Sequence, residues 1–196
     1  MSLTIDFDLS QTRVLSDWAG PVTAPEARAI SAELARLVQR HLRTRDASNA
    51  HTYPEGGRRS HFWRKAAESV TFSGDSDSMT VSVTHQGVRL RYAGAPEGIK
   101  PVNAKALAIP ATGIAYGRLP GEFSDLRIVV FKGKNKAALV QKPGEGEYLG
   151  LIMFWLVKKT KPIKGDPTVL PSANVVLGLA VMRLRNIRDR KAQTNG

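Results

Sequence analysis

Apolar and polar positions alternate with two different periods along this chain, and the changes of period predict its elements. Residues 3–9 alternate apolar with polar side chains, which is the period of a strand with one buried face. An N-terminal strand or arm is therefore expected over residues 1–20. Residues 24–45 place their apolar side chains on one face of a long helix, behind a Thr-Ala-Pro-Glu capping box at Thr23–Glu26. A short helix is expected over residues 60–69.

The middle of the chain, residues 70–158, consists of short apolar runs separated by turn residues, which predicts a β-rich core. The expected strands begin at Val70 and cover Met79–Thr84, Val88–Tyr92, Leu126–Phe131, Ala137–Gln141 and Tyr148–Val157. A further strand should stop at an Ala-Ile-Pro sequence, residues 108–110, before a long loop of small residues. The unbroken apolar run of the last strand indicates burial on both faces.

A final helix is expected over residues 172–191, and its first half is apolar nearly all round. Val175, Val176, Leu179 and Met182 fall largely outside its main apolar stripe. Such a helix is either deeply buried or lies between subunits. Helices near both ends and antiparallel hairpins between them predict a single α+β domain over residues 1–196. Its centre should be an antiparallel sheet or a partial barrel.

The charge of the chain narrows the choice of partners. Its 196 residues include 29 Lys and Arg against 17 Asp and Glu, a net charge of +12. The electric field of such a charge attracts polyanions such as nucleic acid. Composition alone is about equally compatible with a soluble protein whose surface is basic but binds no polyanion. The most apolar run, Tyr148–Val157, is half of the roughly twenty residues that cross a bilayer, and the N-terminus does not resemble a secretory signal. We therefore expect no membrane partner.

Candidate chemistry is sparse. The chain has no cysteine, no pair of histidines at helical metal-site spacing, and none of the common hydrolase, metalloprotease or phosphate-loop motifs. Its acidic and histidine candidates lie in turns or at element ends, where structural use is commoner; they are Asp75, Asp77, Glu145, Glu147, His61, His85 and the segment Glu122–Asp125. We therefore expect no enzyme, no metal and no cofactor.

Lysines gather in two places, without aromatic side chains between them. They are Lys132, Lys134 and Lys136 at a hairpin tip, and Lys158, Lys159, Lys161 and Lys164 in an extended segment. Neither place resembles a base-stacking platform or a base-reading motif. Lysines of this kind suit contact with phosphate groups regardless of base sequence, and for any single one plain solvation remains the commoner role.

The stretch His85–Phe131 contains several different short motifs. They are His85 with Gly87, Ile99–Pro101, the Lys-Ala-Leu-Ala-Ile-Pro run Lys105–Pro110, Ala115–Gly117 and Phe123–Leu126. This run resembles the core signature of the virion morphogenesis proteins of tailed phages, of the type found in Mu-like prophages. That family is related to the neck and tail-completion proteins of other long-tailed phages. The resemblance covers about residues 47–171, but at 162–167 Pro-Ile-Lys-Gly-Asp-Pro stands where the family often has Ile-Pro-Ala-Arg-Pro-Phe.

The resemblance implies a structural virion protein at the head–tail junction, assembled in the bacterial cytoplasm. Its expected partners are further copies in a hexameric ring, neighbouring neck, connector, tail-terminator or tail-tube proteins, and DNA that passes without sequence recognition. The lysines of both groups are then candidates to face DNA. The loops 93–98 and 111–121 are candidates to contact neighbouring rings. The candidate assembly interface comprises Ile114, Tyr116, Leu119, Phe154, Trp155, Val176, Leu179 and Met182.

Two alternatives remain open. One is a tail terminator that caps the tube, which is a structural role at a different level of the particle. The other is a DNA-binding protein that acts free in the cell and ignores base sequence. Steeply salt-dependent binding by the isolated chain favours the second alternative.

Overall fold

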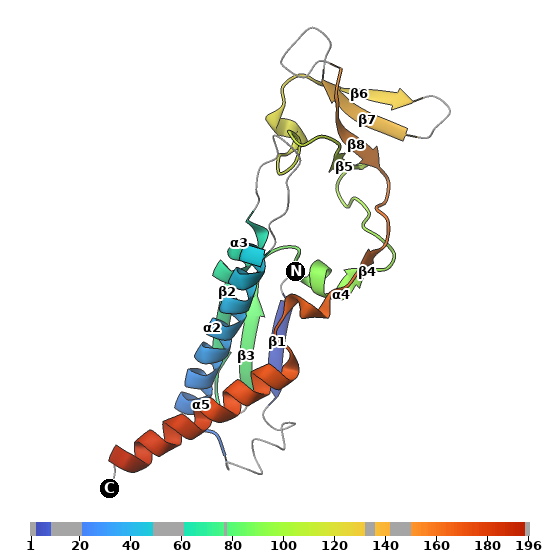
Figure 1. The fold of residues 1–196 in the computed structure, drawn as a ribbon. Helices are drawn as coiled ribbons and strands as arrows, with labels where there is room; N and C mark the ends of the chain where they lie inside the picture. The colour runs from blue at the N-terminus through green and yellow to red at the C-terminus, as the bar shows by residue number, and fades with distance from the viewer. Residues whose placement is uncertain are drawn as a thin grey trace. The chain divides into compact units, whose positions relative to one another are not determined.

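The computed structural model describes residues 3–8, 21–48, 61–76, 78–131, 136–141 and 150–194, with the backbone alone for 3–8. Helices and antiparallel strands both contribute, which confirms the α+β class (Figure 1). The strands divide between two main sheets instead of one central sheet. Correspondingly, the chain forms two compact units where the sequence predicted a single domain. Unit 1 is Met1–Asn49, His61–Gly94 and Gly165–Gly196, and unit 2 is Ala50–Ser60 and Ala95–Lys164.

The sheet of unit 1 has three antiparallel strands in the order β1 (Leu3–Asp8), β3 (Ser78–Val83) and β2 (Val70–Gly74). Along β3 the apolar Met79, Val81 and Val83 are buried and the polar residues between them are half-buried. This alternation is the pattern of a sheet with one face on a core and one face toward solvent. The expected N-terminal strand is confirmed, with Ile5 opposite Val81.

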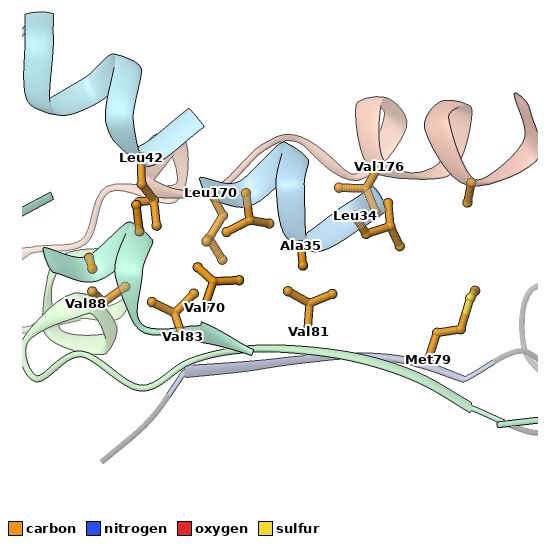
Figure 2. Close-up of a cluster of buried hydrophobic side chains, with 14 of the residues drawn as sticks. Leu34, Ala35, Leu42, Val70, Met79, Val81, Val83, Val88, Leu170 and Val176 are labelled. Carbon is orange, nitrogen blue, oxygen red and sulfur yellow. The ribbon is translucent and has the colours of Figure 1, made fainter. Parts of the chain in front are cut away.

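The long helix α2 (Ala24–Ser48) covers the apolar face of this sheet. Ile30, Leu34, Val38 and Leu42, spaced by four residues, are all buried, and each such side chain contributes roughly 1.5–3 kcal/mol. Figure 2 shows Val81 and other sheet side chains pointing toward those of α2. The helix begins where the capping box predicted, and it ends three residues later than expected.

Two further helices complete the core of unit 1. The short helix α3 (Phe62–Glu68) and the C-terminal helix α5 (Ala173–Thr194) confirm the helices expected over 60–69 and 172–191. Val176, Ala180 and Leu184 of α5 are buried in this core, and α5 crosses α2 (Figure 1). By length and composition alone, the segment Pro167–Thr194 is long and apolar enough to cross a membrane, a test that core helices also pass.

The strand expected at Val88–Tyr92 is wrong, because these residues form the short helix α4 (Val88–Ala93). Glycines bound it on both sides, with φ of 88° at Gly87 and 75° at Gly94, a region that other residues rarely adopt. Only Val88 is fully buried, so the alternation along this segment does not mark a sheet face. Tertiary contacts favour the helix over the strand propensity of its valine and tyrosine.

Unit 2 contains a four-stranded antiparallel sheet in the order β5 (Leu107–Pro110), β8 (Ile152–Val157), β7 (Lys136–Gln141) and β6 (Leu126–Phe131). The β6–β7 hairpin and a strand ending at Ala-Ile-Pro are confirmed. A loop with the 3-10 turn η1 (Pro120–Glu122) leads from β5 into β6.

The core of unit 2 is small. Among the described residues it contains the buried Ala115, Met153 and Phe154, with Phe123 packing edge-on against Phe154 at 5.8 Å. The other residues of β8, such as Trp155 and Val157, are half-buried, so full burial in this strand is limited to Met153 and Phe154. Residues 142–149, including the predicted start of the strand, lie outside the described part of the chain.

The chain leaves unit 1 at Gly94 and returns to it at Gly165. The short strands β4 (Gly94–Ala95) and β9 (Ile163–Lys164) pair with each other. Just beyond, the 3-10 turn η2 (Pro167–Val169) leads into α5. A Cβ atom on Gly165 would lie 2.7 Å from the backbone oxygen of Tyr92, so this return position requires glycine.

Candidate assembly and nucleic-acid surfaces

The lysine-rich segment between β8 and β9 is fixed by backbone contacts at its centre. The amide of Thr160 donates to the carbonyl oxygen of Ile99 at 2.9 Å, and the amide of Ile99 donates to Oγ1 of Thr160 at 2.8 Å. Lys158, Lys159 and Lys161 on either side of Thr160 are exposed. The segment therefore presents its ammonium groups to solvent from a backbone that these hydrogen bonds fix in place.

Glycine makes this close approach possible. Gly98 has φ of 71°, and a Cβ atom there would lie 2.4 Å from the carbonyl oxygen of Thr160. No side chain fits at that distance, and the backbone angle is also one that L-residues rarely adopt. Gly98 is thus a residue on which the placement of the lysine segment depends.

The lysine segment keeps a positive charge. Nζ of Lys159 lies 3.5 Å from Oε2 of Glu97, but the side chain of Glu97 is 91% exposed, so this ion pair is weak. Lys164 in β9 and Lys100 beside Ile99 are exposed too. Several cations on one short stretch of backbone suit a row of phosphates, whose spacing and charge need proximity only.

Lys136, the first residue of β7, adjoins the start of the lysine segment. It is exposed and lines a hollow of about 310 Å³ together with Ile109, Trp155, Leu156 and Val157, the residue before Lys158. The structure therefore brings one lysine of the predicted hairpin tip close to the second group. Lys132 and Lys134 lie outside the described residues.

The candidate assembly residues differ widely in exposure. Met182 on α5 is 63% exposed, and Tyr116 and Leu119 in the loop after β5 are exposed as well. The remaining half-buried candidates pack against the chain's own side chains; they are Ile114, Leu179 and Trp155, whose ring lies 5.8 Å from that of Phe131.

Two of the assembly candidates are not on the surface. Phe154 is 1% exposed because it fills the core of unit 2, and Val176 is buried between α5 and the rest of the core of unit 1. The expectation that they lie at an interface is wrong. Phe154 lies in an unbroken apolar run, and Val176 lies outside the main stripe of a helix that is apolar nearly all round. Neither pattern says which side of the element faces the core.

Sequence reasoning missed the apolar surface of β6. Ile128 is 69% and Val130 68% exposed, and Val129 between them is exposed as well. The signal was present, because the run Ile-Val-Val lacks the apolar–polar alternation of a strand with one wet face. Val175 on α5, which lies outside the apolar stripe of the helix, is a further exposed apolar side chain.

A polar cluster that the sequence did not predict ties η2 to α2. Arg45 donates to the carbonyl oxygen of Thr168 at 3.0 Å and pairs with Asp166, and Nε2 of His41 donates to the same carbonyl at 2.9 Å. The Thr168 hydroxyl and amide and the Arg45 guanidinium hold the pKa of Asp166 below its usual value, although burial opposes them. The guanidinium also lies over the Trp63 ring, 4.9 Å from its centre. These contacts hold η2 against α2.

The histidines and acids weighed as catalytic candidates have structural contacts. Nδ1 of His61 lies 3.6 Å from a carboxylate oxygen of Asp46, and the ring of His85 packs edge-on against Phe62. The remaining described candidates accept hydrogen bonds at turns: Asp75 from the amide of Ser78, Glu122 from the amide of Leu119, and Asp125 from the side chain of Gln141. Within the described residues no group of three His, Cys, Asp or Glu could hold a metal ion. Asp77, Glu145 and Glu147 lie outside them.

The chemistry that these surfaces offer is binding. Unit 2 presents a held row of lysines beside an apolar hollow, and both units expose apolar side chains on regular elements. Such features recognise phosphates and protein surfaces. Comparison of the chain with protein-family models, with curated proteins and with solved structures found no match.

Proposed function

We propose that the chain is a structural virion protein of a long-tailed phage, or of a phage-derived particle, which acts at the head–tail junction in tail completion or as part of a neck ring. The observation that carries the proposal is the resemblance of His85–Phe131 to the virion morphogenesis proteins. Residues of that run have defined structural roles. Gly87 has the positive φ that precedes α4, and Ala115 and Phe123 belong to the core of unit 2. The resemblance therefore concerns the framework of the fold.

Passage of DNA at a junction is supported by the lysine segment. Its exposed ammonium groups, with Lys136 beside them, offer charge to a phosphate backbone without any base-reading side chain among them. Such contacts let a duplex slide, because neighbouring phosphates are equivalent. The net charge of +12 has the same sign as this segment.

Association with further copies and with neighbouring ring proteins is supported by the exposed apolar side chains. Leu119 and Tyr116 are displayed by the loop after β5, and Val175 and Met182 by α5. Exposed apolar groups that gather on one element are commonly covered by a partner. A ring would use two different faces of each copy, because a head-to-tail contact repeats until it closes.

The test is to locate the protein and to remove it. Purified particles made with an affinity-tagged chain should show the tag at the head–tail junction by negative-stain microscopy, and deletion of the gene should leave heads and tails unjoined. A Met182→Lys variant, whose side chain is exposed, should fold normally but fail to complement. Particles that lack the protein, or infectious tailed virions after deletion, would contradict the proposal. A label one ring lower, on the end of the tail tube that adjoins the junction, instead indicates a tail terminator.

A second candidate function is a free DNA-binding protein that ignores base sequence, and the exposed lysine segment is the observation that favours it. The two functions differ in where the chain acts. If the isolated chain binds duplex DNA tightly with a steep salt dependence, and particles lack it, the second function replaces the first.

A further inference from the structure

We infer that β6 is a self-association edge: two copies of the chain pair their β6 strands antiparallel, so that the two four-stranded sheets join into one. This inference does not rest on the head–tail proposal. A two-fold contact closes after two copies, so it is separate from any contact that repeats around a ring.

The first argument is that β6 is the edge of the two main sheets that exposes most apolar surface among the described residues. It pairs with β7 alone, and across its six residues it carries no Lys or Pro and one charged residue, Arg127. Of the other edges, β1 contains Asp6 and Asp8, and β5 is short and ends at Pro110. The edge β2 also lacks these devices, but it exposes one large apolar side chain, Phe72, against three on β6. A weakly protected apolar edge is a template for another strand.

The second argument is the exposure of apolar side chains on β6. In register, Ile128 lies opposite Leu139, which lies opposite the buried Phe154, so these three residues form one row across the sheet. The row is buried in β8 and 69% exposed at Ile128. Val130, which is 68% exposed, ends the neighbouring row, in which Ala137 and Leu156 are half-buried. A strand added beside β6 would continue both rows and cover these two side chains.

The third argument is that the sequence of β6 is complementary to itself in one register. In a two-fold pair of identical strands, opposed residues point to the same face, so the axis must pass through a residue. An axis at Arg127 sets two guanidinium groups against each other. An axis at Ile128 leaves Phe131 outside the ladder.

With the axis at Val129, every opposed pair is favourable. Ile128 then lies opposite Val130 of the second copy, twice, on the face that continues the core. On the other face Val129 meets its own copy, and Arg127 lies opposite Phe131, an arrangement that suits a cation–π contact. The occupant that fits this edge best is therefore a second β6.

The expected affinity is modest. A five-residue ladder with its side chains buries less than the roughly 800 Å² per partner of a standard interface. We expect a dimer that dissociates in the micromolar range, visible by sedimentation velocity on the full chain from low micromolar to several hundred micromolar.

Disruption and rescue test the strand. In Ile128→Lys/Val130→Lys the opposed positions are all cationic, so this variant should stay monomeric at every concentration, with an unchanged circular dichroism spectrum because both side chains are exposed. Ile128→Glu/Val130→Glu should be monomeric too, and a mixture of the two variants should dimerise. Val102→Lys, at a 93% exposed site in the same unit, serves as the control and should dimerise like the wild type.

Crosslinking tests the register, because the chain has no cysteine of its own. Val129→Cys brings the two new thiols together at the axis, within the separation that a disulfide spans, and should crosslink quickly on mild oxidation. Ile128→Cys sets its thiols two residues out of register and should crosslink several-fold more slowly.

Three results would overturn the inference. They are a wild-type chain that stays monomeric at several hundred micromolar, an oligomer that persists in Ile128→Lys/Val130→Lys, and equal crosslinking rates for the two cysteine variants. The second result would leave the ring proposal standing, because it would show an oligomer that does not use β6.

Discussion

Glu26 connects the start of α2 with the second half of α5. Its side chain is only 5% exposed, its Oε2 accepts a hydrogen bond from the amide of Thr23 at 2.9 Å, and its two oxygens lie 3.4 and 3.2 Å from the cations of Arg188 and Lys191. Burial by itself raises the pKa of Glu26. The hydrogen bonds from Thr23, Arg188 and Lys191 outweigh burial and lower the pKa from 4.5 to about 2.

Replacing this carboxylate should therefore destabilise unit 1. We expect Glu26→Gln to lower the free energy of unfolding by about 2 to 3 kcal/mol at neutral pH, because it leaves two cations without their buried partner. Urea titrations of wild type and variant provide the measurement. Glu33→Gln is the control: it breaks the exposed pair between Glu33 and Arg36, 3.0 Å apart, and should change stability by less than about 0.5 kcal/mol.

The same lowered pKa fixes the sign of the pH dependence. A carboxylate with a pKa below its unfolded value contributes its full stabilisation above about pH 5, and the contribution is lost as the pH falls toward about 2. The stability difference between wild type and Glu26→Gln should shrink over that interval. A difference that stays constant from neutral pH to pH 2 would show that the charge of Glu26 is not what stabilises the fold.

At the residue scale, the sequence predicted local roles better than distant ones. The capping box at Thr23 and Glu26 was readable because both of its members lie in one helical turn. The contact of Glu26 with Arg188 could not be predicted, because 162 positions separate the two residues in the chain. The sequence around either residue does not indicate the other. The contact of Arg45 with Asp166 is unpredictable for the same reason.

At the element scale, the two long helices were predictable because periodicity over twenty residues outweighs local exceptions. The helix α4 was not, because its six residues are too few to show a period and its boundaries depend on two glycines with positive φ. The strands β6 and β7 were predicted as a hairpin, but their sequence does not say that β8 rather than β3 pairs with β7. Strand partners depend on the whole fold, which alternation alone does not encode.

The lysine segment gives a prediction about an element. In the triple variant Lys158→Gln/Lys161→Gln/Lys164→Gln we expect weaker binding to duplex DNA and a slope of log affinity against log salt that is smaller by about 2 to 3. Each lysine that contacts a phosphate adds about 0.9 to that slope. Fluorescence anisotropy with a labelled duplex at several salt concentrations measures both quantities.

The matched control removes the same charge elsewhere. Arg28, Arg40 and Arg43 are exposed on α2, and their triple substitution by Gln lowers the net charge of the chain equally. This control should retain most of the wild-type slope. Equal losses in both triple variants would mean that DNA responds to the net charge of the protein and that the segment has no special role.

At the scale of the whole molecule, the unexpected result is the division into two units. The two units differ in composition, because ten of the twelve Lys and seventeen of the twenty-eight Gly and Pro lie in unit 2. The difference is spread over the whole unit, and no linker of low complexity marks its boundaries. Their cores differ as well. Among the described residues nineteen buried apolar side chains form the core of unit 1, and three form that of unit 2.

This difference predicts unequal stability. We expect unit 2 to unfold at lower urea than unit 1, because it buries far less apolar surface. Trp155 reports on unit 2 and Trp63 on unit 1, so variants that retain a single tryptophan, with Phe at the other two positions, separate the two fluorescence transitions. Coincident transitions at both probes would show instead that the units unfold as one cooperative body.

The arrangement of the two units along the chain has a consequence for synthesis. The sheet of unit 2 comes from one continuous stretch, whereas the core of unit 1 needs α5, which is translated after every strand of unit 2. On the ribosome unit 2, the less stable unit, can therefore fold first. During this time the apolar faces of α2 and β3 are not yet covered by α5. The nascent chain should depend on a chaperone until α5 emerges, and truncations that remove α5 should aggregate even when they spare all of unit 2.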